Sequence, residues 1–137
     1  MALTPTKDSV DIGIVTNDPG PMLGFYRGVV GLVPDGETPL PVPGGVSYRL
    51  RCGTTVVKLL ALRKPLPARS APGGIYASTG LRYWTISVPD VTVLLADCET
   101  AGVPIAVPLT EYAPGRRMVI VEDPDGNWVE FVDARPN

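Results

Sequence analysis

The chain of 137 residues contains no histidine, and this absence removes the most common metal ligand of proteins and their usual general base. An Fe(II) site built from two histidines and one carboxylate is therefore excluded. Cysteine is scarce as well, because Cys52 and Cys98 stand alone and form no CxxC motif. We interpret these two residues as reduced, packed thiols rather than as a disulfide.

Basic runs and long apolar runs are also missing. The net charge is −2 and no cluster of Lys and Arg stands out, so the electrostatic footprint of a nucleic-acid-binding protein is absent. No apolar run is long enough to span a membrane, and the first residues do not form a signal peptide. We therefore expect a soluble, cytoplasmic protein with neither nucleic acid nor membrane as a partner.

The most informative stretch of the chain is MVIVEDPDGNWVEFVD, residues 118–133, which has the pattern of a β-hairpin. Pro124 fixes φ in its turn, the neighbouring Asp and Asn side chains can bond to nearby amides, and Gly126 can take positive φ. In the second strand Glu130 shares one face with Trp128 and Val132. A carboxylate within an apolar strand indicates either a solvated face or a cleft.

Two segments of the chain repeat one order of elements. In the first, the pattern predicts a helix with Asp18 as N-cap, Pro19 at its first position and an end near Gly31. We expect strands at 10–16, 47–51 and 55–62 around this helix, with a weak edge strand within 34–45.

In the second segment, the pattern predicts a helix that is capped by Asp90 and ends at Gly102. We expect strands at 81–88 and 104–107 around it, then a loop over 109–117 and the hairpin. Residues 63–80, rich in Pro, Gly, Ala and Ser, are typical of a linker.

The two segments keep a constant spacing. Asp18 and Asp90 are 72 positions apart, and the same distance separates Lys58 from Glu130. The sequence therefore predicts an α+β fold with two βαβββ modules, residues 8–62 and 81–134, joined by the linker 63–80 within one domain, 1–137. Neither module is expected to bury its sheet alone.

Several motifs of the repeat point to one family. They are Asp18, Phe25-Tyr26-Arg27 with Gly31-Leu32, Val88-Pro89-Asp90, and the ending DPDGNWVEF. This set resembles the vicinal oxygen chelate superfamily, the group of glyoxalases, bleomycin-resistance proteins and extradiol dioxygenases. The resemblance implies that the two modules curl as a mixed sheet into an incomplete barrel around a cleft. It also implies metal ligands on the first and last strand of each module.

Carried over by position, the four ligand places are Asp11, Lys58, Tyr83 and Glu130. Only Glu130 is a usual ligand there, while Lys58 is a cation with no lone pair to give. We therefore expect no metal and no other cofactor at these places. If a cation binds, it should be a hard one held by Asp11 and Glu130, with Lys58 turned away.

The four places admit two interpretations. In one, Lys58 and Glu130 form a coupled pair in a cleft that binds a ligand or transfers protons. In the other, the pair is a structural salt bridge that fills the place where the family binds a metal ion. Strand alternation and nearby loops supply the ligand-binding candidates Asp11, Tyr83, Thr85, Trp128, Tyr48 and Arg116. Trp128 could equally be packed in the core, and Arg116 could equally be a solvated charge.

Two functional classes follow from the resemblance. The first is a metal-independent small-molecule-binding protein of the bleomycin-resistance type, which would take an organic ligand, aromatic or cationic. The second is a lyase or isomerase that uses Glu130 and Lys58 as acid and base, with a bell-shaped pH–rate profile. A non-catalytic relative with a closed cleft is a third possibility, so enzymatic activity stays open here. The small members of the superfamily form homodimers, and we expect a homodimer.

Overall fold

The computed structural model describes residues 2–135 and divides the chain into two compact units, Met1–Pro67 and Ala68–Asn137. The boundary falls inside the predicted linker 63–80. The first unit contains β1 (Ile12–Val15), α1 (Pro19–Leu23), the π-helical segment η1 (Gly24–Val29), β2 (Val33–Pro39), β3 (Gly45–Cys52) and β4 (Thr55–Leu62). The second contains the 3₁₀ turn η2 (Gly74–Tyr76), β5 (Tyr83–Ser87), α2 (Val91–Thr100), β6 (Ile105–Ala113), β7 (Arg116–Glu122) and β8 (Trp128–Ala134).

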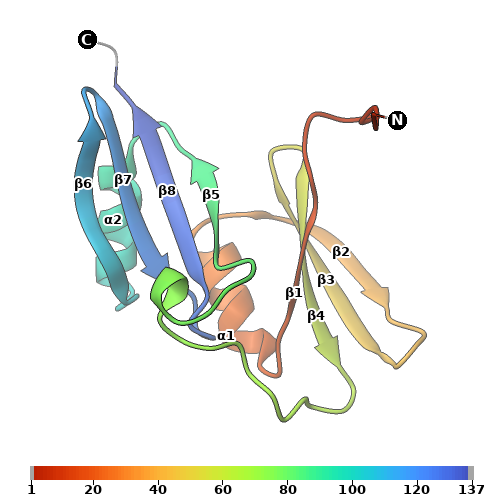
Figure 1. Cartoon of the computed structure of the whole chain (residues 1–137). Coiled ribbons are helices and arrows are strands. Elements are labelled where there is room, and N and C mark those ends of the chain that lie inside the picture. The colour runs from red at the N-terminus through yellow and green to blue at the C-terminus, as the bar shows by residue number, and fades with distance from the viewer. Residues whose placement is uncertain (1, 136–137) are drawn as a thin grey trace. The chain divides into compact units, whose positions relative to one another are not determined.

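Each unit forms one four-stranded mixed sheet (Figure 1), with the strand order β1-β4-β3-β2 in the first and β5-β8-β7-β6 in the second. In both sheets the first strand of the unit runs parallel to the last, and the remaining pairs are antiparallel. The register repeats too, because Gly13 lies opposite Lys58 and Thr85 opposite Glu130. The predicted α+β class with two βαβββ modules is confirmed.

A helix covers one face of each sheet. In the first unit α1 packs on β4, and Met22, Tyr26 and Leu59 are fully buried in the core. In the second unit α2 packs on β7 and β8, and Cys98 and Phe131 are both fully buried. On each strand the residues that face the helix are apolar, because alternate side chains of a strand point to the same side of the sheet.

The two helices differ in regularity. Asp90 caps α2 as predicted, because its carboxylate accepts a hydrogen bond from the Thr92 amide at 2.9 Å. Asp18 precedes α1, and Pro19 is its first residue, but Asp18 makes no side-chain capping bond. α1 continues from Gly24 as η1, which ends at Val29, near the predicted stop.

One predicted loop is a strand, and one predicted edge strand lies slightly away from its predicted place. The stretch 109–117 is not a loop, because β6 extends to Ala113 and pairs with β7 through three register shifts. β6 is an edge strand, where Pro108 costs no central ladder bond, and its exposed polar residues hide the strand pattern. The weak edge strand predicted within 34–45 is present as the exposed β2, displaced toward Val33.

The hairpin turn after β7 forms as its residues predict. Asp123 Oδ1 accepts hydrogen bonds from the amides of Asp125 and Asn127, both at 2.9 Å. Gly126 adopts φ of 84°, a value that other residues rarely take. In the part of the chain that the structure describes, no helix is long and apolar enough to cross a membrane.

Candidate functional site

The face of the first sheet opposite α1 carries three cations. Val57 and Leu59 point toward the helix and are fully buried, so Lys58 points to the other face. Arg49 lies directly opposite Lys58 on the neighbouring strand, and Arg51 and Ser47 follow one pleat away in each direction. We call Ser47, Arg49, Arg51 and Lys58 the basic face.

Asp11 stands just before β1, at the margin of this face. Its Oδ1 accepts hydrogen bonds from Lys7 Nζ at 2.6 Å and from the Val56 amide at 2.9 Å. The bond from Lys7 is the largest cause that lowers the pKa of Asp11, followed by the Val56 amide, with a smaller effect from the charge of Lys58. This carboxylate is therefore ionised and already paired with a cation.

The corresponding face of the second sheet carries a carboxylate instead. Thr85 lies opposite Glu130, and its hydroxyl donates to Glu130 Oε1 at 2.7 Å. Tyr83 lies opposite Trp128 one pleat away and is 49% exposed. We call Tyr83, Thr85, Trp128 and Glu130 the acidic face, and the structure brings these four predicted residues together within one unit.

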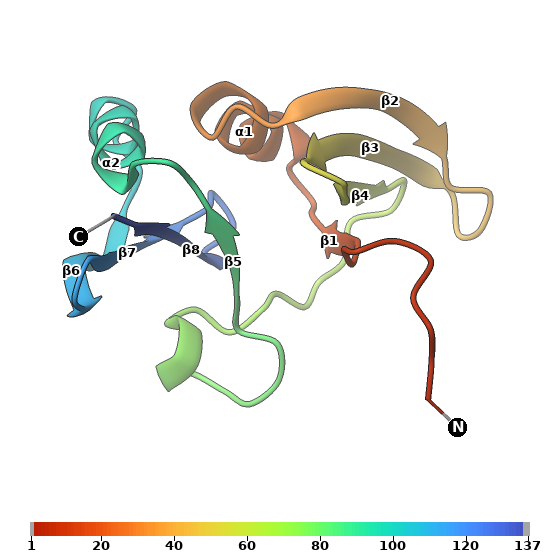
Figure 2. The ribbon, with the colours of Figure 1, turned by 90° about the horizontal axis from the view of Figure 1, so that it is seen from above.

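Trp128 is the exception to the expected open surface, because it is only 6% exposed. Figure 2 shows η2, in the green stretch of chain before β5, on the side of the second sheet away from α2. Gly74 lies so close to the Trp128 ring that an added Cβ would be 2.0 Å from a ring atom. The ring of Tyr76 packs edge to face against the same indole, with the ring centroids 6.3 Å apart. Arg82 holds this segment by donating to the Gly74 carbonyl at 2.8 Å. The indole ring is therefore packed rather than available for stacking.

Two other predicted residues lie away from these faces' centres. Tyr48 pairs with Leu59, which places it on the helix-covered side of the first sheet and not beside Lys58. Arg116 is exposed at the start of β7, opposite Ala134. It shares a side of the sheet with Glu130, but four strand residues separate their levels, about 13 Å. Lys58 and Glu130 belong to different units, so their pairing stays a prediction.

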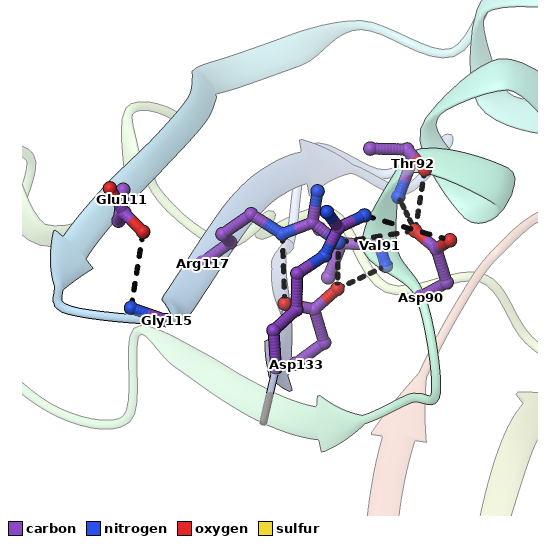
Figure 3. A network of polar contacts seen from close by, with 8 residues as sticks. Asp90, Val91, Thr92, Glu111, Gly115, Arg117 and Asp133 are labelled. Carbon is purple, nitrogen blue, oxygen red and sulfur yellow. Dashed lines mark hydrogen bonds and ion pairs between the residues drawn. The ribbon is translucent and has the colours of Figure 1, made fainter. Parts of the chain in front are cut away.

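An ion-pair network around the buried carboxylate of Asp133 lies on the helix side of the second sheet, and the residue pattern alone did not predict it (Figure 3). Arg117 Nε donates to Asp133 Oδ1 at 3.1 Å, and its Nη2 reaches Asp90 Oδ1 at 3.2 Å. Asp133 Oδ2 also accepts from the Val91 amide at 2.9 Å, at the start of α2. The hydrogen bond from Arg117 is the main reason that the pKa of Asp133 is lowered, and it raises the pKa of Arg117 in turn. The network ties the helix to β7 and β8.

The residues at the family's four ligand places do not fit a divalent metal ion. Lys58 offers no lone pair, and the Asp11 oxygen that faces Lys7 and Val56 already accepts two hydrogen bonds. Tyr83 is a poor ligand while protonated, which leaves Glu130 as one good donor where a site needs at least three. Across residues 2–135 no three His, Cys, Asp or Glu side chains gather as a metal site would require.

Strand pairing was the signal that could have found the missed residues. The two-residue turn Gly53–Thr54 fixes the pairing of β3 with β4, and counting back from it places Arg49 opposite Lys58. Counting back from the longer turn in the same way pairs Arg117 with Asp133. No sequence pattern predicts that residues 74–76 pack on Trp128. That contact depends on a close approach of the backbone that only a glycine at position 74 permits.

Comparison with known proteins yields one matching family model, which is described as Glyoxalase/Bleomycin resistance protein/Dioxygenase superfamily and covers residues 9–131. No curated protein matches the chain.

Solved structures resemble the fold closely at low identity. A glyoxalase family protein from Bacillus cereus has a TM-score of 0.82 at 15% identity, with 99% of each chain covered. The trypanothione-dependent glyoxalase I of Leishmania major has a TM-score of 0.73 at 23% identity, over 93% of this chain and 87% of that one. TnmS3, an antibiotic binding protein from a Streptomyces species, has a TM-score of 0.70 at 18% identity, over 96% of this chain and all (100%) of that one. These likenesses concern the fold alone.

Proposed function

Because the chain belongs to the glyoxalase/bleomycin resistance protein/dioxygenase superfamily, we propose that it binds a small organic molecule and does so without a metal ion. The observation that carries the proposal is the acidic face. There Glu130, held by the Thr85 hydroxyl at 2.7 Å, lies one pleat from the half-exposed ring of Tyr83. A positioned carboxylate beside an aromatic ring is a binding arrangement that needs no metal.

The chemistry of this face favours an aromatic or cationic ligand. Thr85 donates to one oxygen of Glu130, which orients the carboxylate and leaves lone pairs for a ligand donor. The exposed part of Tyr83 offers a ring for stacking or for a cation–π contact. TnmS3, an antibiotic binding protein of similar fold, supports a binding role.

Binding of a set of aromatic amines, measured by calorimetry and mapped by amide NMR shifts, tests this proposal. We expect shifts at Tyr83, Thr85 and Glu130, and we expect Glu130→Gln to weaken binding by about tenfold or more, since a charged hydrogen bond is lost. Glu99→Gln is the matched control, because Glu99 is exposed on α2. Unchanged affinity in Glu130→Gln would refute the proposed role of the acidic face.

A second candidate is a lyase or isomerase, favoured by the hydrogen bond that fixes Glu130 in one orientation on an accessible face. Glu130 would then take a proton from the bound molecule and Lys58 would act as the acid. In that case Glu130→Gln would abolish turnover with a small change in substrate affinity, and kcat would show a bell-shaped pH profile. A binding protein would show no turnover of any bound molecule.

We also propose a homodimer, because within residues 2–135 each outer strand has a neighbouring strand on one side only. The edge strands are β1 and β2 in the first sheet and β5 and β6 in the second. Pairing between copies would cover such edges. Light scattering at micromolar concentration should give twice the monomer mass of 14.5 kDa. The monomer mass throughout a dilution series would contradict the dimer.

The free thiols support the proposed cytoplasmic location. Cys98 is buried and Cys52 is half-buried. Burial raises the pKa of the Cys98 thiol to about 11, so this thiol is protonated at neutral pH and unreactive. Reduced, packed cysteines are typical of proteins in a reducing compartment.

A further inference from the structure

We propose that the basic face of the first sheet binds an anionic oxygen group, a carboxylate or a phosphate, on a small organic molecule. The inference rests on the proposed function, because Lys58 belongs to both, but it assigns a different sheet and the opposite charge from the acidic face. All of its residues lie in the first unit.

The first support is charge. Arg49, Arg51 and Lys58 stand on adjacent strands of one sheet face, and Asp35 is the carboxylate that the structure pairs with the two arginines. Three cations against this carboxylate leave a positive field at the face, because Asp11 at the margin is already offset by its ion pair with Lys7. Strands about 5 Å apart and side chains about 7 Å apart along one strand place Arg49 and Lys58 within reach of a single anionic group.

The second support is the distance of the existing counter-ion. Asp35 Oδ2 lies 3.9 Å from Arg49 Nη2, and Asp35 Oδ1 lies 3.7 Å from Arg51 Nε. Both distances exceed the roughly 3.2 Å limit of an ordinary N–H···O hydrogen bond. A ligand oxygen that approached to hydrogen-bonding distance would therefore compete well with Asp35 for the guanidinium groups.

The third support is Ser47, which is independent of charge. Ser47 is only 3% exposed, and its hydroxyl finds no hydrogen-bond partner within residues 2–135. It lies on the same face as Arg49, one pleat along β3, opposite Leu60. A buried hydroxyl without a partner costs free energy, and a bound oxygen group would relieve that cost.

Together these groups select the class of ligand. Guanidinium groups form paired hydrogen bonds to carboxylate and phosphate oxygens, an ammonium adds a point charge, and a hydroxyl donates one further bond. A cationic group would be repelled at this face. The glycine at position 13, opposite Lys58, leaves the neighbouring strand β1 without a side chain there.

The test uses three probes that share one ring: benzoate, phenyl phosphate and benzylamine. Each is titrated into the full ¹⁵N-labelled chain at low salt, and the amide shifts are mapped. We expect benzoate and phenyl phosphate to shift Ser47, Arg49 and Lys58, with binding that weakens as NaCl is added. The tighter of the two anions assigns carboxylate or phosphate, and either order supports the inference.

Substitutions at this face are expected to change the affinity in opposite directions. Arg49→Gln and Lys58→Met should each weaken binding of the better anion by about tenfold or more, since each removes a charged hydrogen bond. Asp35→Asn should tighten binding, because it removes the competing carboxylate. Ser47→Ala should weaken binding without lowering thermal stability. Arg27→Gln is the matched control, because Arg27 is exposed on η1 and its loss should change nothing.

The outcomes separate this inference from the proposed function. If benzylamine shifts the acidic face while the anions shift nothing on the basic face, the inference is wrong and the proposed function stands. Anion binding that is unchanged in both Arg49→Gln and Lys58→Met would also overturn it. If none of the three probes shifts either face, both proposals are wrong.

Discussion

The two units share a backbone plan but anchor their helices differently. In the second unit Asp90 caps α2, and the buried Asp133 binds both Arg117 and the Val91 amide. In the first unit Asp18 occupies the place of Asp90 without a capping bond, and Ala61 occupies the place of Asp133. The anchored helix is a regular ten-residue α-helix, whereas the other changes to π-helix after five residues. Strand register and helix anchoring are thus separable features of one repeat.

The open faces differ in the same way. Lys58 and Glu130 hold equivalent positions in the repeat, yet one stands among arginines and the other is hydrogen-bonded to a threonine. The two equivalent backbone positions therefore present groups of opposite charge. Equivalent residues of the two units can therefore be substituted separately in the cores, at the helix N-termini and on the open faces.

The largest effect is expected from the equivalent core residues Phe131 and Leu59, which are both fully buried. Phe131→Ala should lower the free energy of unfolding by about 4 kcal/mol and Leu59→Ala by about 3 kcal/mol, because each leaves a cavity. Urea unfolding followed by circular dichroism measures both. A loss below about 1 kcal/mol in either variant would show that the two cores are not equivalent.

Removal of the buried anchor should follow in size. The Asp133 side chain is fully buried, so Asp133→Ala leaves the Arg117 charge and the Val91 amide without their partner. We expect a loss of about 3 kcal/mol, the cost typical of breaking a buried ion pair. Asp97→Ala, at an exposed position on α2, is the control and should have little effect. Equal stability of the two variants would contradict the anchoring role.

A smaller difference should separate the two helix caps. Asp90→Ala removes the bond to the Thr92 amide and a contact with Arg117, so it should lower Tm. Asp18→Ala removes no side-chain capping bond and should leave Tm nearly unchanged. Thermal unfolding of both variants beside the wild type measures this difference. A larger loss in Asp18→Ala than in Asp90→Ala would contradict this difference between the caps.

The smallest effect is a pH dependence. Because Arg117 holds the folded pKa of Asp133 below its ordinary value of 3.8, the ionised pair stabilises the fold above that pH. This stability is lost as the pH falls through the folded pKa. The difference in unfolding free energy between wild type and Asp133→Asn should thus be constant from about pH 5 to 7 and shrink below 3.8. A difference that grew on acidification would contradict the sign.

The sequence predicted the parts of the fold that local rules control. The hairpin turn at Asp123–Asn127, the cap of α2 by Asp90 and the alternation of apolar residues all depend on neighbours in the chain, and the constant spacing of 72 positions exposed the repeat. The cap predicted at Asp18 does not form, because its side chain makes no capping bond. The extension of β6 was missed because exposed edge strands have no apolar period.

The candidate site was predicted only in part, for the same physical reason. Thr85 and Glu130 were placed together because strand parity is a local rule. The covering of Trp128 by Gly74, and the pairing of Arg117 with Asp133, depend on contacts between residues distant in the chain. Contacts between strands can be predicted only when it is known which residues of the two strands pair. That pairing depends on the lengths of the turns rather than on the types of residue.

The central claim is that this chain binds its ligand without a metal, and one titration tests it most directly. Protein treated with a chelator is titrated with the best aromatic amine, and the experiment is repeated after addition of Zn²⁺ or Ni²⁺. With one good donor at the family's ligand places, we predict dissociation constants that agree within about twofold. Binding that appears only after the metal is added would contradict the claim.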